Sequence, residues 1–427
     1  MLDDVREAYS TGMPPQLARG LLALDAEVAV SARGATVQTK SGRELVDLAS
    51  GGFGFGHPRI LEAVKEQVRK MPLSSRVFYS VPLARLLERI AQVTPGDLAV
   101  SFFGNAGAEA VEGALKLVKG YHRKRTRVVS AIGGYHGATT GALAVSGIEK
   151  LRYPMRDPAR RPVQASWVPF GDVGAMERAV DESVAAVILE PVQLATEVAV
   201  PPAGYLRAVR RRCTDVGALL IADETITGLG PTGKMFGVDH DGVVPDIMVL
   251  AGVLGGGMLS IGGYVTTRAI NDKVYDKRDP LLHANTTGGN PTACTAALTT
   301  LEIIEQEGLA GKAAILGQKL QRHLTSLAER YPGVVTRARG QGLFGSITLA
   351  GGTETARALQ RAALARGVMV RVFAPDPSVN AGHVAVRAPL TVSESELQTG
   401  LAALDAALDA VLNEKAPMNG VGAGVQL

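Results

Sequence analysis

The stretch Leu219-Leu220-Ile221-Ala222-Asp223-Glu224 places four apolar residues in a row before a carboxylate. A short, continuous apolar run of this kind is typical of a strand that is buried on both faces of a sheet. Four further runs, each bounded by polar or glycine-rich turns, have the same character: Ala99–Phe103, Arg127–Ala131, Ala185–Leu189 and Ile247–Leu250. These runs predict the central strands of one large sheet.

Helical patterns alternate with these strands. Between the first two runs, apolar residues recur at the i, i+3, i+4 and i+7 spacing of an amphipathic helix, at Val111, Ala114, Leu115 and Val118. Buried strands separated by helices predict a mostly parallel sheet that is covered on both faces. The sequence therefore indicates an α/β fold.

The region after residue 310 is richer in helical patterns and contains two late strand-like runs, at Val368–Phe373 and Val384–Arg387. We expect a large domain over residues 61–310, and a smaller α+β domain built from residues 1–60 and 311–413. The glycine-rich tail, residues 414–427, is expected to be flexible.

The composition is that of a large globular protein. The chain has 427 residues, of which 46% are hydrophobic and 20% charged, enough to bury a sizeable core. The net charge of +4 comes with basic clusters such as Arg123-Lys124-Arg125, but only 4% of the residues are aromatic. Basic clusters without interleaved aromatic residues are typical of solvated helix faces, so no nucleic-acid partner is expected.

The sequence contains no recognisable targeting or metal motif. The N-terminus opens acidic, at Asp3 and Asp4, without the apolar core of a secretory signal. Residues 247–265 carry no charge, but their six glycines make a poor transmembrane helix, so a buried strand and a tight turn are expected there. Cys213 and Cys294 are too few and too far apart for a disulfide framework or a metal site. We expect a cytoplasmic protein with no metal and no membrane partner.

A turn of small residues, Gly104-Asn105-Ala106-Gly107-Ala108-Glu109-Ala110, lies between the first predicted strand and the first predicted helix. The free backbone N–H groups of such a helix start, together with the positive end of the helix dipole, suit a phosphate group. Gly107 and Ala108 are therefore candidate phosphate-binding residues. Taken alone, a glycine turn before a helix is ordinary architecture.

Two polar motifs follow other strands, at the carboxyl ends where ligands bind in open α/β sheets. Gly134-Tyr135-His136-Gly137 follows the second run, and Asp223 closes the run at Leu219–Ala222. A carboxylate at the end of buried apolar residues is costly unless a cation accompanies it. Asp223 is therefore expected to meet a positively charged group.

In their order and separation, these motifs resemble those of the class III (ω-type) aminotransferases over roughly residues 34 to 412. The turn at 104–110 is similar to the family's "NSG(T/A)EA" phosphate cup, and residues 134–137 match its "YHG" motif. Glu190-Pro191-Val192-Gln193 resembles "EPIQ", and residues 282–291 resemble "HGxTFGGNP". The resemblance implies a large domain of the aspartate-aminotransferase-like type (fold type I).

The resemblance also implies a cofactor, pyridoxal 5′-phosphate (PLP) or its amine form, pyridoxamine 5′-phosphate (PMP), and the residues that bind it. Tyr135 stacks on the pyridine ring, and Asp223 pairs with the protonated ring nitrogen. Thr286 reaches the phosphate of the neighbouring subunit's cofactor, so a homodimer with shared active sites is expected. The cofactor-binding set implied is Gly107, Ala108, Tyr135, His136, Glu190, Asp223, Thr225 and Thr286.

One position departs from the family at its reacting residue. Pro245–Gly257 resembles the segment "VPDI…LAKxLGGG", whose lysine forms a Schiff base with PLP, and Gly252 stands in the place of that lysine. Glycine can neither hold the cofactor covalently nor carry a proton. Non-covalent binding of PLP or PMP is expected, with an external aldimine or PMP persisting rather than turning over.

A second departure concerns the substrate. Members that accept α-amino acids pair a glutamate after "EPIQ" with an arginine near the C-terminus, and these places hold Ala195 and Ala385. Glu197 and Arg387 each lie two residues further on, where they either rebuild the pair or face solvent. Loss of the pair indicates a substrate without an α-carboxylate, such as an amino sugar, a polyamine or a carrier-bound intermediate of specialised metabolism.

Three functions fit these features. The first is an aminotransferase that moves an amino group between an amine or amino acid and an aldehyde or ketone, with its lysine replaced so that an intermediate is trapped. The second is a natural lysine-free lyase, epimerase or decarboxylase that uses PLP or PMP, with a base at His136, His283 or Thr225. The third is a non-catalytic protein that has kept the fold.

Overall fold

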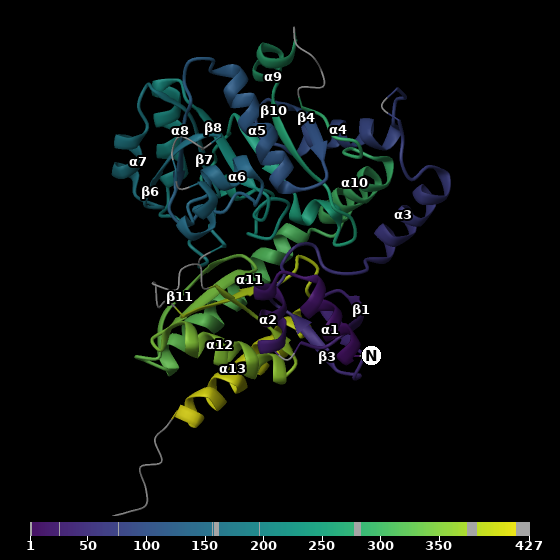
Figure 1. Ribbon diagram of the computed structural model, residues 1–427, viewed down its shortest axis with the longest axis vertical. Helices are drawn as coiled ribbons and strands as arrows, with labels where there is room; N and C mark the ends of the chain where they lie inside the picture. The colour runs from purple at the N-terminus through teal and green to yellow at the C-terminus, as the bar shows by residue number, and fades with distance from the viewer. Residues whose placement is uncertain are drawn as a thin grey trace, which may run out of the picture.

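The computed structural model describes residues 2–24, 26–75, 77–155, 157, 162–195, 197–276, 283–373 and 382–415. Two lobes are visible in Figure 1, a larger one built around a wide sheet and a smaller one in which the first and last segments of the chain lie together. Among the described residues, the predicted tail contributes only the end of the last helix, which reaches Lys415.

The larger lobe contains the seven-stranded sheet and the helices that cover it. Its strands are β4 (Leu98–Gly104), β5 (Arg127–Ala131), β6 (Gln164–Val168), β7 (Val184–Leu189), β8 (Leu219–Glu224), β9 (Ile247–Leu250) and β10 (Gly262–Thr267). Its helices are α3 (Pro58–Lys70), α4 (Val81–Val93), α5 (Gly107–Tyr121), α6 (Thr140–Val145), α7 (Val173–Ala179), α8 (Tyr205–Val216), α9 (Arg268–Tyr275) and α10 (Pro291–Gln306). Short 3₁₀ turns are η1 (Glu149–Met155), η3 (Gly237–His240) and η4 (Gly252–Gly255).

The strand order, β4-β10-β9-β8-β7-β5-β6, brings the carboxyl ends of six strands to one edge of the sheet. Strands β5 to β9 pair in parallel, whereas β10 is antiparallel to both of its neighbours, β9 and β4. Because two antiparallel pairings restore the original direction, β4 runs the same way as β9. The prediction of a mostly parallel α/β sheet is confirmed.

The sequence predicted five of these seven strands and missed β6 and β10. The segment expected to be one buried strand and a tight turn contains two strands, β9 and β10, joined through η4. Adjacent glycines, Gly262 and Gly263, open β10, and glycine weakens a strand pattern. Close packing explains them, since a Cβ at Gly262 would lie 2.4 Å from the carbonyl carbon of Ala106.

The smaller lobe holds two four-stranded sheets. One joins β1 (Ala29–Arg33), β2 (Thr36–Thr39) and β3 (Glu44–Asp47) to β13 (Val368–Met369), which pairs with β3 in parallel. The other joins β11 (Val335–Gln341), β12 (Phe344–Leu349), β15 (Gly382–Arg387) and β14 (Arg371–Phe373). The lobe's helices are α1 (Leu2–Gly12), α2 (Pro15–Ala23), α11 (Leu309–Arg330), α12 (Gly352–Ala365) and α13 (Glu394–Lys415). The parallel pairing of β3 with β13 joins the first and last parts of the chain in this lobe.

The central strands form the core because nearly every side chain along them is apolar. All residues of β7, β8 and β9 are buried, and they pack between helices on the two faces of the sheet. Helix ends are set by local chemistry. The side chain of Asn290 caps α10 by accepting a hydrogen bond from the Ala293 amide at 2.8 Å, and α8 stops at Gly217 in the left-handed conformation.

The turn after η4 packs directly against the backbone of the N-terminal segment. Gly257 has φ +69°, and a Cβ there would lie 1.8 Å from the carbonyl oxygen of Gly54. Two segments that are about two hundred positions apart in the chain therefore touch only because residue 257 has no side chain. This contact fixes the turn after η4 relative to the N-terminal segment around Gly54. Helix η4 itself begins at Gly252.

We predict that Gly257→Ala lowers the free energy of unfolding by at least ~3 kcal/mol, because left-handed strain and a backbone clash add together. The matched control is Gly242→Ala, since Gly242 has φ +62° but nothing within 4 Å of a Cβ there. That variant should lose only about 1 kcal/mol from strain. Urea denaturation compares the two, and equal losses would contradict the close contact at Gly54.

Candidate active site

The residues predicted from separate motifs meet at the carboxyl edge of the large sheet. The turn at 104–108 follows β4, Tyr135 and His136 follow β5, Glu190 follows β7, and Gly252 follows β9. Asp223 is the last residue but one of β8. Parallel alignment of these strands brings side chains from distant parts of the chain to a single site.

Asp223 and His136 form a buried ion pair at the centre of this edge. The side chain of His136 is 1% exposed and that of Asp223 is 0% exposed. His136 Nδ1 lies 2.7 Å from Asp223 Oδ2. Burial disfavours the charged imidazole, but the hydrogen bond to Asp223 and the nearby carboxylates outweigh it, so the pKa of His136 is raised. The Thr225 amide donates to the other oxygen, Asp223 Oδ1, at 3.1 Å.

The pair leaves each oxygen of the carboxylate able to accept one more donor. Each carboxylate oxygen has two lone pairs. Oδ2 has one donor, from His136, and Oδ1 has one donor, from the Thr225 amide. His136 Nε2 lies 3.2 Å from Ser130 Oγ, so both ring nitrogens have a partner. His136 therefore orients Asp223 and is poorly placed to act as a free base.

Glu190 is a second buried carboxyl group beside the pair. It is 3% exposed, and its Oε1 accepts a hydrogen bond from the Tyr135 amide at 2.8 Å. Burial raises the pKa of Glu190 to about 7, although the His136 charge opposes the shift. The hydrogen bond ties the Tyr135 turn to the end of β7, and the Tyr135 side chain stays partly exposed.

The start of α5 offers free backbone donors. Ala106 precedes the helix with φ −154° and no side-chain cap, and Ala106 is exposed while Gly107 and Ala108 are half-buried. The Asn105 amide is already taken, because it donates to Glu109 Oε2 at 2.7 Å. Uncapped amides at the positive end of a 15-residue helix suit a phosphate dianion.

Close contacts join this helix start to the ends of β8 and β9. A Cβ at Gly107 would lie 3.0 Å from Thr225 Cγ2 and 3.2 Å from Ala251 Cβ. Thr225 and Ala251 are themselves half-buried, so they form the wall between the helix start and Asp223. Ala251 was not among the residues predicted from the sequence, because a single alanine carries no chemical signal.

Gly252 lies at the open rim of the same site. It is exposed, begins η4, and has φ +51°, a left-handed conformation that glycine adopts without strain. A Cβ on this backbone would lie 2.4 Å from the Thr225 carbonyl oxygen. Any side chain at position 252 therefore requires the Thr225 turn or η4 to move.

Two predicted residues lie away from Asp223. His283 packs against Phe102, with ring centroids 4.4 Å apart, and its Nδ1 lies 3.3 Å from Lys116 Nζ, so its role as a base stays a prediction. Thr286 is exposed and lines a cavity of about 1050 Å³ with Phe78 and Ser101. Phe102 and Phe103 of β4 also line this cavity.

The register-shifted glutamate–arginine pair does not form. Glu197 Oε1 lies 2.9 Å from Arg339 Nη1, in β11, whereas Arg387 is only 8% exposed. The expectation that Arg387 faces solvent is also wrong. Ala385 packs in a small apolar cluster with Val192, Leu194, Val198 and Phe344.

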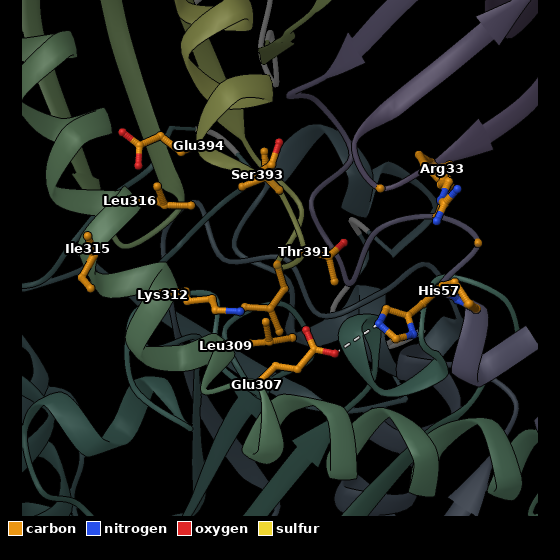
Figure 2. A pocket seen from close by; sticks show the side chains of 16 residues that line it. Arg33, His57, Glu307, Leu309, Lys312, Ile315, Leu316, Thr391, Ser393 and Glu394 are labelled. Carbon is orange, nitrogen blue, oxygen red and sulfur yellow. Dashed lines mark ion pairs between the residues drawn. The ribbon is translucent and has the colours of Figure 1, made fainter.

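A second cavity, of about 580 Å³, lies between the N-terminal loop, the start of α11 and the residues before α13 (Figure 2). His57 and Glu307 form an ion pair across it at 3.4 Å, and Arg33 and Lys312 also line it. None of the predicted site residues borders this cavity. In the described part of the chain, no group of His, Cys, Asp and Glu residues could hold a metal ion, and no helix is long and apolar enough to cross a membrane.

Comparison with known proteins agrees with the geometry. The family model of the class III aminotransferases matches residues 25–408. An (S)-enantioselective omega-transaminase from Thermomicrobium roseum is similar at 29% identity and a TM-score of 0.87, with 96% of this chain and 98% of that chain covered. The ornithine aminotransferase of Toxoplasma gondii is similar at 26% identity and a TM-score of 0.83, with 96% and 99% covered.

A third solved structure bears on the cofactor. An amine transaminase from an uncultivated Pseudomonas species, solved in its PLP-bound form, is similar at 27% identity and a TM-score of 0.82, with 90% of this chain and 95% of that chain covered. These likenesses confirm the fold type I prediction and the prediction of PLP as cofactor.

We predict that stability falls by about 1–3 kcal/mol between pH 4.5 and 7 through Glu190. The folded-state pKa, about 7, lies above the ordinary value of 4.5, so the contribution is full below pH 4.5 and is lost as the pH rises through 7. Urea denaturation at several pH values measures it. Glu190→Gln should reduce the decline, and the remainder comes from Glu224, whose burial raises its pKa to about 7 as well. An unchanged decline in the variant would contradict the account.

Proposed function

Because this chain belongs to the class III aminotransferase family, we propose that it acts on small amines and carbonyl compounds with PLP or PMP held at Asp223 without a covalent bond. The observation that carries the proposal is Gly252, an exposed glycine at the end of β9. The likeness of Pro245–Gly257 to the family's lysine segment supports its assignment to the lysine position. The substrates proposed are an amine or amino acid and an aldehyde or ketone.

The residues present fit the cofactor. The uncapped amides of Gly107 and Ala108 suit its phosphate, and the carboxylate of Asp223, held by His136, suits a protonated ring nitrogen. The half-buried Tyr135 stands on the turn after β5 and suits a ring face. When bound, the cofactor supplies a carbonyl group that accepts an amine and a ring that withdraws electrons from it.

The lysines that flank the segment do not replace the missing one. Lys234 Nζ donates to the Asp239 carbonyl oxygen at 2.9 Å, and Lys273 Nζ lies 3.5 Å from the ring centroid of Tyr121. The amine of Lys234 is thus held at Asp239 and that of Lys273 at Tyr121. A non-covalent cofactor is therefore the state that we propose.

A second candidate function is a lysine-free lyase, epimerase or decarboxylase. The left-handed backbone at Gly252 favours it, because this conformation suits glycine and places the Thr225 carbonyl where a side chain would begin. In that case a proton would be moved by Thr225 or by Glu190, whose carboxyl group titrates near neutral pH.

We predict that borohydride reduction of the PLP-loaded protein leaves no phosphopyridoxyl group on the chain, and that gel filtration strips the cofactor. Gly252→Lys should give a reduced adduct at residue 252, because its amine then stands at the rim of the site. Mass spectrometry of peptides is the measurement. An adduct on any lysine of the unmodified chain would disprove non-covalent binding.

The matched control is Gly252→Ala, which tests the backbone without adding an amine. Both variants should unfold at a lower temperature than the parent, because both add a Cβ at φ +51°. Only the lysine variant should form the adduct. If that variant then exchanges amino groups between an amine and a ketone, the aminotransferase is favoured; if it does not and the glycine protein turns over substrate, the lysine-free enzyme is favoured.

A homodimer with shared sites is also proposed, supported by an apolar surface beside Thr286. We define the 77–81 surface as Val77, Phe78, Tyr79 and Val81, which are 81%, 71%, 105% and 62% exposed. Phe78 lines the same cavity as Thr286. Contiguous exposed apolar residues of this kind are typical of an interface.

We predict that Phe78→Glu dissociates the dimer and weakens PLP binding at least tenfold, because Thr286 then no longer reaches the partner's phosphate. Val30→Glu is the control, since Val30 in β1 is 59% exposed and lies outside this surface. Sedimentation at micromolar concentration and titration with PLP measure both effects. A 44.5 kDa species in the parent protein that still holds PLP would contradict the proposal.

A cytoplasmic location is part of the same proposal. Cys213 and Cys294 are both buried and free, and burial raises the pKa of each thiol to about 12. Such thiols are typical of proteins from a reducing compartment.

A further inference from the structure

The cavity of about 580 Å³ in Figure 2 lies where the chain crosses between the two lobes. The chain leaves the smaller lobe through residues 55–58, just before α3, and returns through residues 307–309, between α10 and α11. Both crossings line the cavity, together with the turn at 33–34 and the segment 390–394 before α13. A molecule held in this cavity therefore contacts both connections between the lobes.

Hydrogen bonds hold the first crossing in place on both sides. Gly34 and Phe55 exchange backbone hydrogen bonds at 2.8 and 2.9 Å, and the Thr391 amide donates to the Phe53 carbonyl oxygen at 2.9 Å. The Thr391 hydroxyl donates to the same oxygen at 2.8 Å. The walls of the cavity are therefore formed before any ligand arrives, as is usual for small-molecule sites.

Much of the wall is apolar. The side chains of Leu309, Leu316, Leu390 and Val392 are buried, whereas Ile315, which also lines the cavity, is 60% exposed. A cavity of roughly 300–1,000 Å³ with apolar walls and a few charged groups is typical of a binding site for a small molecule. The wall thus offers a surface for the apolar part of such a molecule.

The two carboxylates that line the cavity each face a basic side chain. Glu307 Oε1 lies 3.4 Å from His57 Nε2. Glu394 forms an ion pair with Lys319 of α11, which does not line the cavity. Neither contact involves the other two charged residues of the wall.

Those two residues are cations without a partner. Arg33, at the end of β1, and Lys312, in the first turn of α11, form no side-chain hydrogen bond or ion pair with any residue that the structure describes. Figure 2 shows them on opposite sides of the cavity, with Leu309 and Thr391 between them. Two separated positive charges with apolar groups between them suit an apolar chain that carries a negative group at each end.

We propose that this cavity binds a small aliphatic dicarboxylate, with one carboxylate at Arg33, the other at Lys312 and the methylene chain against Leu309. Each cation matches the single charge of one carboxylate, whereas a phosphate group at either end would bring about 1.5 to 2 negative charges. The ligand is not a substrate, since neither Asp223 nor any other proposed cofactor-binding residue borders the cavity. Its binding does not depend on PLP.

The test is isothermal titration of the full chain at low salt, with succinate, adipate and suberate as dicarboxylates of increasing length. Adipamide is the neutral counterpart, and 1,6-diaminohexane is the counterpart of opposite charge. At least one dicarboxylate should bind roughly tenfold or more tightly than both counterparts, as expected for two charge-assisted contacts. That dicarboxylate should also raise the melting temperature, because it binds only the folded chain.

The double variant Arg33→Gln/Lys312→Gln should lose both the preference for the dicarboxylate and the rise in melting temperature. Without ligand, it should melt at the same temperature as the parent, because neither side chain has a partner to lose. The matched control is Arg357→Gln/Arg361→Gln in α12, which removes the same charge from exposed residues outside the cavity and should keep the preference.

Three results would overturn the proposal. The first is a preference for the dicarboxylate that survives in Arg33→Gln/Lys312→Gln, since the ligand would then bind elsewhere. The second is a parent protein that binds no dicarboxylate more tightly than adipamide. The third is tighter binding of 1,6-diaminohexane than of every dicarboxylate, because Glu307 and Glu394 would then determine the charge of the ligand.

Discussion

The buried pair of Asp223 and His136 is the interaction on which the site depends. A carboxylate at the end of a fully buried strand is tolerated because an imidazole 2.7 Å away shares its charge and the Thr225 amide donates to it. The pair holds a negative charge at a fixed point beside an uncapped helix start. We propose that a small molecule with a cationic ring at one end and a phosphate at the other binds at these two points.

The sheet and its glycines deliver the pair to this point. Because β10 reverses direction between β9 and β4, the strands on both sides end at the same edge. Gly107 and Gly262 then allow the helix start to sit against Thr225 and over β10. The start of α5 is therefore placed by close contacts, with side-chain atoms of Thr225 and Ala251 at Gly107 and with the backbone of Ala106 at Gly262.

Local chemistry made much of this predictable. Asp223 follows a buried apolar run, and the turn at 104–108 joins a strand to a helix, so each can be recognised from its neighbours in the sequence. The outcome for Arg387 and Glu197 could not be predicted, because it depends on how β15 and β11 pack. Strand β10 was missed because its adjacent glycines weaken the strand pattern. The glycine at 262 is needed because the backbone of Ala106, more than 150 positions away in the chain, packs directly against it.

The most direct test of the central claim is a crystal structure of the protein grown with PLP. We expect electron density for the cofactor with its ring nitrogen at Asp223, its phosphate at the amides of Gly107 and Ala108, and a gap of van der Waals size between its reactive carbon and every lysine. Density continuous with a lysine Nζ, or a cofactor bound away from Asp223, would contradict the account.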